Sequence, residues 1–295
     1  MDMEPNIVIL GDALDVLKAL RRESVDFIFT SPPYGDNRRG AYQGVPIDEY
    51  VKWFLPISKQ LRRVLRPHGS LVLIIKERAY RGERATYVLE LILKMKKQGW
   101  LWVEEYIWHK KNCYPGKWPN RFRDAWERCL HFAKQKNFNM YQEEVMEPIG
   151  DWAEKRLKKL SDADQARHES RVHSGFGRRV ANWVGRERVY PDNVLVFATE
   201  CANRGHPATF PSSLAAWFIR LFTQPNEIVL DPFLGSGSSA LACTELDRQY
   251  IGIERVEDYY RTALDSIAAK AGRALGLRYA SEQRDVVGVQ TTFDA

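Results

Sequence analysis

EIVLDPFLGSGSSALAC, residues 227–243, is the stretch that decides the fold. Residues 227–230 have the apolar character of a buried strand, residues 236–246 have the apolar spacing of a helix, and Gly235 and Gly237 lie in the turn before it. Glycine allows a tight turn and close approach of a ligand, and the helix N-terminus offers unpaired N–H donors. The stretch therefore predicts a ligand site at a strand's carboxyl end, although glycine also occurs in such turns for purely steric reasons.

Two acidic residues indicate which ligand the turn would hold. Glu254 ends the next strand, and an acidic residue about 20 positions beyond a glycine turn suits two ribose hydroxyls. The dinucleotide fingerprint GxGxxG is incomplete, because Ala240 replaces its third glycine. Asp231, at the tip of the strand, would repel a phosphate and attract an ammonium group. S-adenosylmethionine carries both an ammonium and a ribose, and so fits better than NAD.

Strand-like and helix-like patterns alternate along most of the chain. The pattern predicts a strand, helix and strand at 6–10, 13–22 and 25–30, then a helix, strand, helix and strand at 48–66, 70–76, 85–98 and 102–110. It resumes with strands at 194–198, 227–230 and 250–254 and helices at 212–223, 236–246 and 256–270. This order predicts an α/β fold with a mostly parallel twisted sheet and helices on both faces.

Composition narrows the class of protein. No apolar run approaches the roughly 18 residues that cross a bilayer, and the N-terminus lacks a signal-peptide pattern, so we expect a cytoplasmic protein without a membrane partner. The formal charge of +6 favours polyanion partners, though weakly. The four cysteines, Cys113, Cys129, Cys201 and Cys243, form no CxxC pair, which predicts neither a metal site nor a disulfide framework.

A second motif, TSPPYG at residues 30–35, leaves the apolar strand that precedes it. Together with DPFLGSGSS at 231–239, it resembles the DNA amino-methyltransferases of restriction–modification systems. The order, with the SPPY motif first, resembles the β-class of that family. GDALDVLKAL at 11–20 and RGHPATFPSSLAAWFIRLF at 204–222 are similar to further family segments. The resemblance implies a Rossmann-like, circularly permuted fold that uses S-adenosylmethionine and brings both motifs to adjacent strand ends.

The resemblance also implies a domain organisation. Residues 1–134 and 193–280 would form the catalytic domain, 135–192 an inserted target-recognition region, and 281–295 a polar tail. The charged composition of the insertion is equally typical of a solvated surface segment. Double-stranded DNA is the implied partner, and a homodimer is favoured because family members are often dimers. The location would be the nucleoid of a bacterial or archaeal cell, or of a cell carrying a phage.

The chemistry of the family assigns roles to Ser31, Pro32, Pro33 and Tyr34. The lone pair of an exocyclic amino group is delocalised into the base, so the enzyme must accept hydrogen bonds from its N–H groups. Ser31 Oγ and the Pro32 carbonyl would accept them, while the two prolines remove backbone donors. Tyr34 would stack on a flipped base. The alternative is a rigid strand exit whose tyrosine packs on the core.

The residue before Pro-Pro-Tyr bears on the target base. Ser31 favours N4 of cytosine, since Asp or Asn there accompanies N6 of adenine in most of the family. N6 of adenine stays the alternative, because a serine hydroxyl can also accept from that amino group. Methylation at cytosine carbon 5 needs a thiolate, and none of the four cysteines lies in a comparable turn.

Further residues are implied to contact the cofactor. Asp12 would lie near the adenine ring and can also cap the helix that starts at Ala13. The expected contacts are Asp12, Ala13, Thr30, His206, Pro207, Thr209, Phe210, Asp231, Pro232, Phe233, Gly235, Ser236, Gly237 and Glu254.

Basic residues in three segments would contact DNA phosphates, although each segment could instead be an ordinary solvated surface. The candidates are Arg38 and Arg39 in the loop 35–44, Lys110, Lys111, Lys117 and Arg121 in 108–123, and Arg178, Arg179, Arg186 and Arg188 around Trp183.

Two other functions remain open. One is an RNA or protein-side-chain methyltransferase with a similar turn. The other is an inactive nucleic-acid-binding module, which the presence of both complete motifs argues against.

Overall fold

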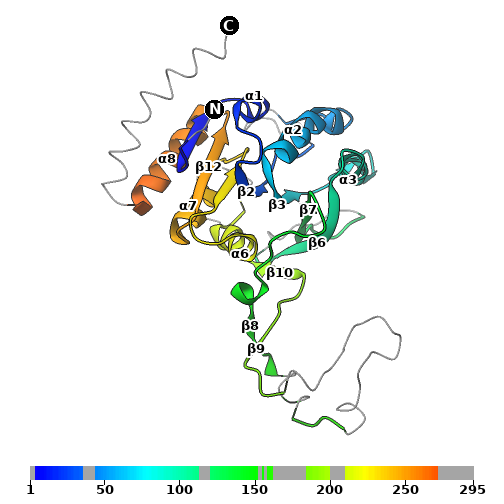
Figure 1. Cartoon of the computed structure of the whole chain (residues 1–295). Helices are drawn as coiled ribbons and strands as arrows, with labels where there is room; N and C mark the ends of the chain where they lie inside the picture. Colours follow the sequence, from blue (N-terminus) through cyan, green and yellow to red (C-terminus); the bar gives the residue numbers. More distant parts are fainter. Residues whose placement is uncertain are drawn as a thin grey trace. The chain divides into compact units, whose positions relative to one another are not determined.

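The structure is a computed structural model that describes residues 4–35, 44–112, 120–151, 155, 158–161, 184–199 and 210–271. The chain divides into two compact units (Figure 1). The first comprises Met1–Tyr141 with Asn193–Ala295, and the second Gln142–Asp192.

Among the described residues, eight strands form the central sheet of the first unit. In spatial order they are β1 (Ile7–Leu10), β12 (Gln249–Glu254), β11 (Ile228–Asp231), β2 (Val25–Thr30), β3 (Leu65–Ile75), β7 (Trp126–Ala133), β6 (Leu101–Lys110) and β10 (Val194–Phe197). All neighbours pair in parallel except β7, which is antiparallel to β3 and β6. The predicted α/β class with a mostly parallel sheet is confirmed.

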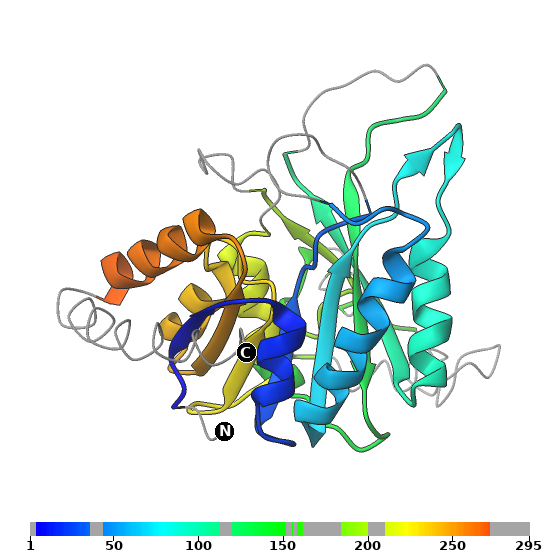
Figure 2. The same ribbon diagram turned by 90° about the horizontal axis from the view of Figure 1, so that it is seen from above.

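Helices cover both faces of this sheet (Figure 2). They are α1 (Ala13–Ala19), α2 (Tyr50–Val64), α3 (Tyr87–Lys97), α6 (Ser212–Phe222), α7 (Ser238–Glu245) and α8 (Glu257–Ala271). The helices α1, α2 and α3 connect β1, β2, β3 and β6, which follow one another in one direction across the sheet. The helices α6 and α7 connect β10, β11 and β12, which follow one another in the opposite direction. Right-handed crossovers therefore put the two groups on opposite faces.

Strand β2 is buried along its whole length because helices lie on both sides of it. Phe27 packs on Phe222 of α6, with ring centroids 5.2 Å apart, while Ile28 joins the cluster on the α2 side. Burial on both faces explains the uninterrupted apolar run in the sequence. It also fixes the end of β2, where the TSPPY motif begins.

Two parts of the central sheet differ from the sequence prediction. No strand was expected at β7, because its buried interior holds Glu127, Arg128 and His131 and so lacks a recognisable apolar run. The segment 66–69, expected to end a helix, instead belongs to β3, whose register against β2 shifts between the pairs formed by Val25 and Phe27.

The second unit contains, among its described residues, a short 3₁₀ helix, η1 (Gln142–Val145), and the antiparallel pair β8 (Glu147–Pro148) and β9 (Arg188–Val189). The second unit starts at Gln142, later than residue 135, where the insertion is expected. The residues just before Gln142 form backbone hydrogen bonds within the first unit. The N–H of Asn139 donates to His68 at 2.9 Å, and that of Tyr141 to Leu221 at 2.7 Å. The predicted tail, 281–295, lies outside the described residues.

One more small hairpin, β4 (Ala79–Tyr80) with β5 (Glu83–Arg84), extends beyond β3. In the described part of the chain, no helix is both long and apolar enough to cross a membrane.

Gly69 lets β3 approach β2, and its replacement should destabilise the fold. A Cβ at this position would lie 2.4 Å from the backbone oxygen of Asp26. We expect Gly69→Ala to lower the free energy of unfolding by about 1–3 kcal/mol, as overpacking does, measured by urea denaturation. Lys96→Ala on α3 is the control, since Lys96 is exposed and surface substitutions of this kind change stability by less than about 0.5 kcal/mol. An unchanged stability of Gly69→Ala would contradict this account of the strand pair.

Candidate functional site

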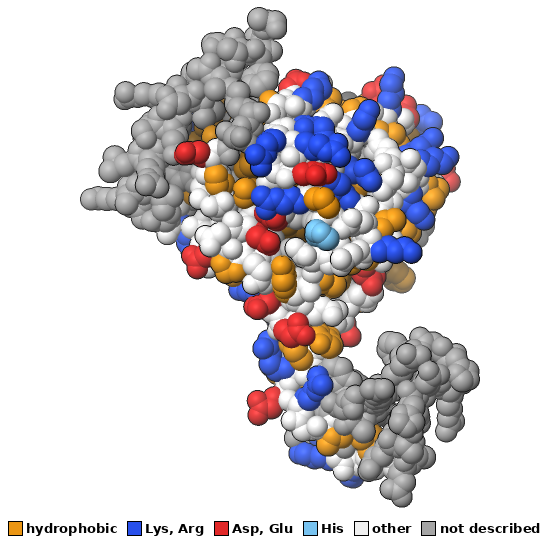
Figure 3. Space-filling view, in the orientation of Figure 1, with side chains coloured by type: hydrophobic (Ala, Val, Ile, Leu, Met, Phe, Trp, Pro, Cys, Tyr) orange, Lys and Arg blue, Asp and Glu red, His pale blue; other side chains and the backbone are white. Residues whose placement is uncertain are grey.

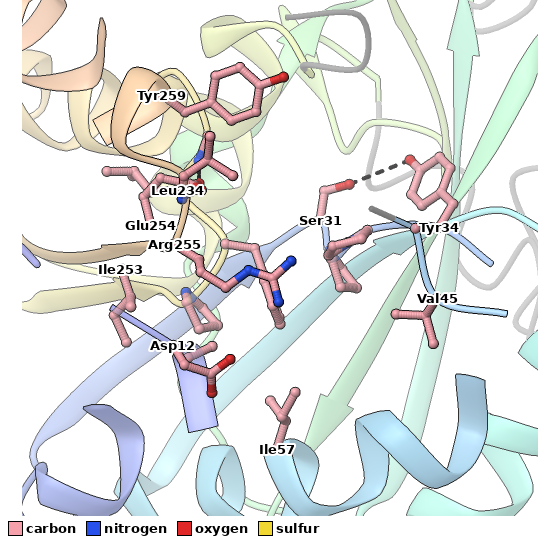
Figure 4. Close-up of a pocket in the computed structure, with 18 of the residues that line it drawn as sticks. Asp12, Ser31, Tyr34, Val45, Ile57, Leu234, Ile253, Glu254, Arg255 and Tyr259 are labelled. Atoms are coloured by element: carbon pink, nitrogen blue, oxygen red, sulfur yellow. Dashed lines mark hydrogen bonds between the residues drawn. The ribbon is translucent and has the colours of Figure 1, made fainter. Parts of the chain in front are cut away.

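A cavity of about 400 Å³ opens at the carboxyl ends of β1, β12, β11 and β2 (Figure 4). Each of these parallel strands delivers the segment that follows it to the cavity wall. Residues after β1, β2, β11 and β12 therefore meet although they are far apart in the chain. The cavity lies where open α/β sheets bind ligands, and its volume is typical of small-molecule sites.

The TSPPY turn contributes one wall of the cavity. Ser31 Oγ donates a hydrogen bond to the Tyr34 hydroxyl at 3.4 Å (Figure 4), and Tyr34 in turn donates to the carboxylate of Glu127. The N–H of Gly35 donates to the Tyr87 hydroxyl at 3.4 Å. A Cβ at Gly35 would lie 3.1 Å from the Tyr87 ring, so the glycine allows this close approach.

Glu127 lies behind this wall on β7. It is 6% exposed, and its second oxygen accepts from Lys110 Nζ at 2.5 Å. Burial, and then the charge of Glu127, raise the pKa of Tyr34 well above its usual value. The Tyr34 phenol therefore stays protonated and keeps its hydrogen directed at Glu127.

Asp231 ties the two motifs together from inside. Its Oδ1 accepts from Thr30 Oγ1 at 2.7 Å and from the N–H of Phe233 at 3.1 Å, and its Oδ2 accepts from Ser239 Oγ at 2.6 Å. Thr30 and Asp231 stand 201 positions apart in the chain. Burial raises the pKa of Asp231 to about 6, although its three donors act in the opposite direction. Asp231 does not line the cavity, so its expected contact with an ammonium group stays a prediction.

The glycine turn needs its glycines for backbone reasons. Gly235 and Gly237 have φ values of 57° and 95°, in the left-handed region that favours glycine. Gly237 immediately precedes α7, and a Cβ there would lie 3.2 Å from Ala263 Cβ. The turn thus packs directly against α8 while Gly235 faces the cavity.

Glu254 presents a partly engaged carboxylate to the cavity. Its Oε2 accepts from the N–H of Gly235 and its Oε1 from that of Val256, both at 2.8 Å. Each carboxylate oxygen can accept a second hydrogen bond. Burial is the largest influence on Glu254 and raises its pKa. The arrangement holds both oxygens in fixed positions with capacity left for two hydroxyl donors.

Asp12 combines the two roles that the sequence suggested. Its Oδ1 accepts from the N–H of Leu14 at 2.9 Å and so caps α1. Asp12 and Ala13 also line the cavity.

The structure brings most of the predicted catalytic and cofactor-binding residues to one place. Those lining the cavity are Asp12, Ala13, Ser31, Pro32, Pro33, Tyr34, Phe210, Pro232, Phe233, Gly235 and Glu254. Thr30, Asp231, Ser236 and Gly237 are close in the fold without lining it. His206, Pro207 and Thr209 lie outside the described residues.

Sequence reasoning missed a further part of the lining. It comprises Gly11, Gly44, Val45, Pro46, Trp53, Ile57, Leu234, Ser238, Ile253, Arg255, Val256 and Tyr259. Arg255 and Val256 could have been found, because they follow Glu254 at the same strand end. Trp53 and Ile57 lie one helical turn apart on α2, a spacing equally typical of core residues.

The predicted DNA contacts have different surroundings. Lys110 is paired with Glu127, and Lys111 is exposed just beyond β6. Arg121 precedes β7, at the same sheet edge as the cavity because β7 is antiparallel. Arg186 and Arg188 belong to the second unit, where Arg188 donates to the Met146 carbonyl at 2.5 Å. Arg38, Arg39, Lys117, Arg178 and Arg179 lie outside the described residues.

Among the described residues, possible metal ligands do not cluster and the two cysteines are buried. The described part of the chain contains no group of three or more His, Cys, Asp or Glu residues that could hold a metal ion. Cys129 and Cys243 are buried, and burial raises the pKa of both thiols.

The raised pKa of Asp231 gives a testable pH dependence. Asp231 has a pKa of about 6 in the folded protein and the ordinary pKa of 3.8 in the unfolded chain, so only the folded protein keeps this proton between the two values. Between these pH values the contribution of Asp231 to stability therefore falls as pH rises, by up to about 3 kcal/mol. Asp231→Asn should remove this dependence, because an amide oxygen can still accept from Thr30 and Phe233.

The measurement is urea unfolding of wild type and Asp231→Asn at several pH values from 4 to 7. The wild type should lose stability relative to the variant across this range. A difference that does not change with pH would contradict the prediction.

Comparisons with known proteins identify the family of this chain. Residues 25–265 match the family N6_N4_Mtase, described as DNA methylase. The Type II methyltransferase M.PvuII of Proteus hauseri is 28% identical over 93% of this chain and 85% of its own length. M.SmaI of Serratia marcescens, also a Type II methyltransferase, is 27% identical over 88% of this chain and 90% of its own length.

Solved structures share the fold. PvuII DNA methyltransferase (cytosine-N4-specific) superposes with a TM-score of 0.65 at 23% identity, over 88% of this chain and 86% of that one. The M1.HpyAVI–SAM complex superposes with a TM-score of 0.54 at 22% identity, over 88% and 98%. With the match over residues 25–265, the chain belongs to the N6_N4_Mtase family of DNA methylases, the S-adenosylmethionine-dependent DNA amino-methyltransferases of restriction–modification type.

Proposed function

We propose that this protein transfers a methyl group from S-adenosylmethionine to the N4 amino group of cytosine in double-stranded DNA. One observation carries the proposal. The acceptor-rich turn Ser31–Tyr34 and the glycine turn with Glu254 line the same cavity, although they are distant in the chain. One part suits an amino-group substrate and the other a nucleoside cofactor.

The cavity fits S-adenosylmethionine, which supplies a methyl group bound to a positively charged sulfur. Glu254 can accept from two ribose hydroxyls, and Asp12 lies at the same wall. Trp53 and Phe233, whose ring centroids are 5.8 Å apart, and Tyr259 provide apolar surface for a purine ring. Hydrogen-bond acceptors combined with aromatic walls are typical of sites for such cofactors.

The TSPPY turn can prepare the amino group for attack. The Ser31 hydrogen is directed at Tyr34, which leaves the lone pairs of Ser31 Oγ to accept from the substrate N–H. The Pro32 carbonyl would be the second acceptor. With both N–H groups held, the nitrogen lone pair is drawn out of conjugation and aimed at the methyl carbon. Positioning and fixed dipoles then promote a direct in-line displacement, with no covalent intermediate on the enzyme.

A base inside a duplex cannot reach this turn, so the target nucleotide must leave the stack. Tyr34 is partly exposed, and its hydroxyl is fixed by Ser31 and Glu127. The ring would offer a flipped base a stacking surface in one fixed orientation.

Ser31 supports cytosine as the target. A relative of known structure is described as cytosine-N4-specific, in agreement with a serine before Pro-Pro-Tyr. N6 of adenine is the alternative, because the same hydroxyl can accept from that amino group. The order of the two motifs supports the circularly permuted version of the fold.

Product analysis tests the target base. Purified protein is incubated with labelled S-adenosylmethionine and DNA that lacks the modification, and the nucleosides are separated by mass spectrometry. We expect N4-methylcytosine. Finding N6-methyladenine alone would overturn the choice of base, and incorporation into RNA but not DNA would overturn the substrate class.

The edge of the sheet around the cavity has features that suit DNA. Lys111 is exposed there, and Phe122, which is 98% exposed, lies between Arg121 and Arg123. Cations flanking an aromatic ring can bind phosphates and stack on bases. The second unit, with Arg186 and Arg188, is the proposed target-recognition region.

A second copy of the chain is the other proposed partner. Exposed apolar side chains on β6 and the edge strand β10 support a homodimer, because a neighbouring subunit would bury them. They are Leu101, Trp102, Val103, Val194 and Val196. The proposed location is the nucleoid.

Figure 3 shows a second concentration of basic side chains, over the part of the first unit where Figure 1 places α1 and α2. Arg22 lies in the loop between α1 and β2, at the strand ends opposite the cavity, and its side chain is 71% exposed. It therefore provides a control for charge at the cavity edge.

We expect Lys111→Glu to weaken DNA binding about equally for all sequences. The negative slope of log K against log salt should become shallower by about 1–2. Arg22→Glu, with the same change in net charge, should leave both quantities close to wild type. Fluorescence anisotropy over a range of salt concentrations measures them. Equal effects of the two variants would contradict the assignment of this edge to DNA.

A further inference from the structure

We propose that Glu127 is the final acceptor of the proton that the target amino group loses on methylation, and that Tyr34 and Ser31 relay it. The proposal rests on the proposed function and deepens it. Glu127 does not line the cavity, so it acts as a positioning and proton-accepting residue through two side chains that do.

The direction of each hydrogen bond follows from Glu127. A carboxylate can only accept, so Tyr34 donates to Glu127 Oε2. The Tyr34 oxygen is then available to accept from Ser31 Oγ, 3.4 Å away. Ser31 consequently turns its hydrogen away from the cavity and its lone pairs toward it. The buried carboxylate of Glu127 thus determines, through Tyr34, that Ser31 Oγ presents lone pairs and not its hydrogen to the substrate.

The residues around Glu127 keep its carboxylate oriented toward Tyr34. Lys110 Nζ occupies the other carboxylate oxygen at 2.5 Å, which leaves Oε2 to Tyr34. Lys76, whose pKa is lowered by burial, is a second nearby amine, and it lies 3.5 Å from Asp124. Glu127 and Lys110 are both largely buried, so solvent screens their interaction with Tyr34 less than at the surface.

Methyl transfer and proton release together conserve atoms, electrons and charge. The nitrogen lone pair forms the new N–C bond while the S–C bond breaks, and its electron pair returns to sulfur, which becomes neutral. The methylated nitrogen now carries a positive charge and releases one proton to Ser31 Oγ. The Ser31 proton moves to Tyr34, and the Tyr34 proton moves to Glu127, which becomes a neutral carboxylic acid. No oxidant, reductant or metal takes part.

Glu127→Gln tests the relay. The amide can donate to Tyr34 and so reverse the chain, which would turn the Ser31 hydrogen toward the substrate. We expect the single-turnover rate of methyl transfer to fall about 100-fold, the lower range for proton-transfer groups. The dissociation constant for S-adenosylmethionine, measured by calorimetry, should stay within about twofold, since Glu127 is outside the cavity. Glu127→Asp keeps the charge and should recover part of the rate.

Glu77→Gln is the matched control. Glu77 is 8% exposed and pairs with Arg128, whose Nε lies 3.0 Å from its carboxylate. Its replacement therefore also removes one buried, paired carboxylate, without contact to Ser31 or Tyr34. We expect the methyl-transfer rate of Glu77→Gln to stay within about threefold of wild type. A loss equal to that of Glu127→Gln would overturn the proposal.

Coupling to Tyr34 separates a relay from a general structural effect. Tyr34→Phe keeps the ring but cuts the chain, so adding Glu127→Gln to Tyr34→Phe should change the rate by less than about threefold. A full additional 100-fold loss would show that Glu127 acts independently of Tyr34 and would overturn the proposal. Failure of the proposed function is distinguishable, because the wild type would then not methylate DNA amino groups at all.

Discussion

The buried carboxylate of Asp231 is the interaction on which the rest of the site depends. It accepts from Thr30 at the end of β2, from the backbone after β11 and from Ser239 in α7. These three bonds fix the TSPPY turn and the glycine turn relative to each other. A carboxylate without water is costly to bury, and its donors offset that cost. The residue that we expected to attract the cofactor's ammonium thus holds the two halves of the site together.

The other parts of the site lie at the carboxyl ends of neighbouring strands. Glu254 ends β12, the glycine turn follows β11, and the TSPPY turn follows β2. The strands are adjacent and parallel, so their carboxyl ends form one edge. The strand order alone therefore brings the TSPPY turn, the glycine turn and Glu254 to one cavity. Its precision comes from the register of buried strands.

The sequence was sufficient for the parts of the site that depend on short motifs. Gly235, Glu254 and Ser31 could be assigned because their spacing and their places after apolar strands limit the possible geometry. Glu127 could not be found in this way. It lies in β7, where buried charged residues are paired with partners from distant strands, and a single sequence does not reveal such pairs. The sequence also did not show that the Asp231 carboxylate bonds within the protein and does not line the cavity, because its partner Thr30 is 201 positions away in the chain.

Backbone hydrogen bonds hold the chain on either side of the second unit. Just before it, Tyr141 bonds to Leu221, and just after it, Asn193 accepts from the N–H of Ile107 at 2.8 Å. Both ends of the inserted segment are therefore fastened to the first unit by backbone bonds that do not depend on side-chain identity. Evolution could exchange the whole segment between these two points and leave the methyl-transfer chemistry intact. With target recognition assigned to the second unit, as we propose, the residues that line the cavity and the residues that select the DNA site lie in separate units.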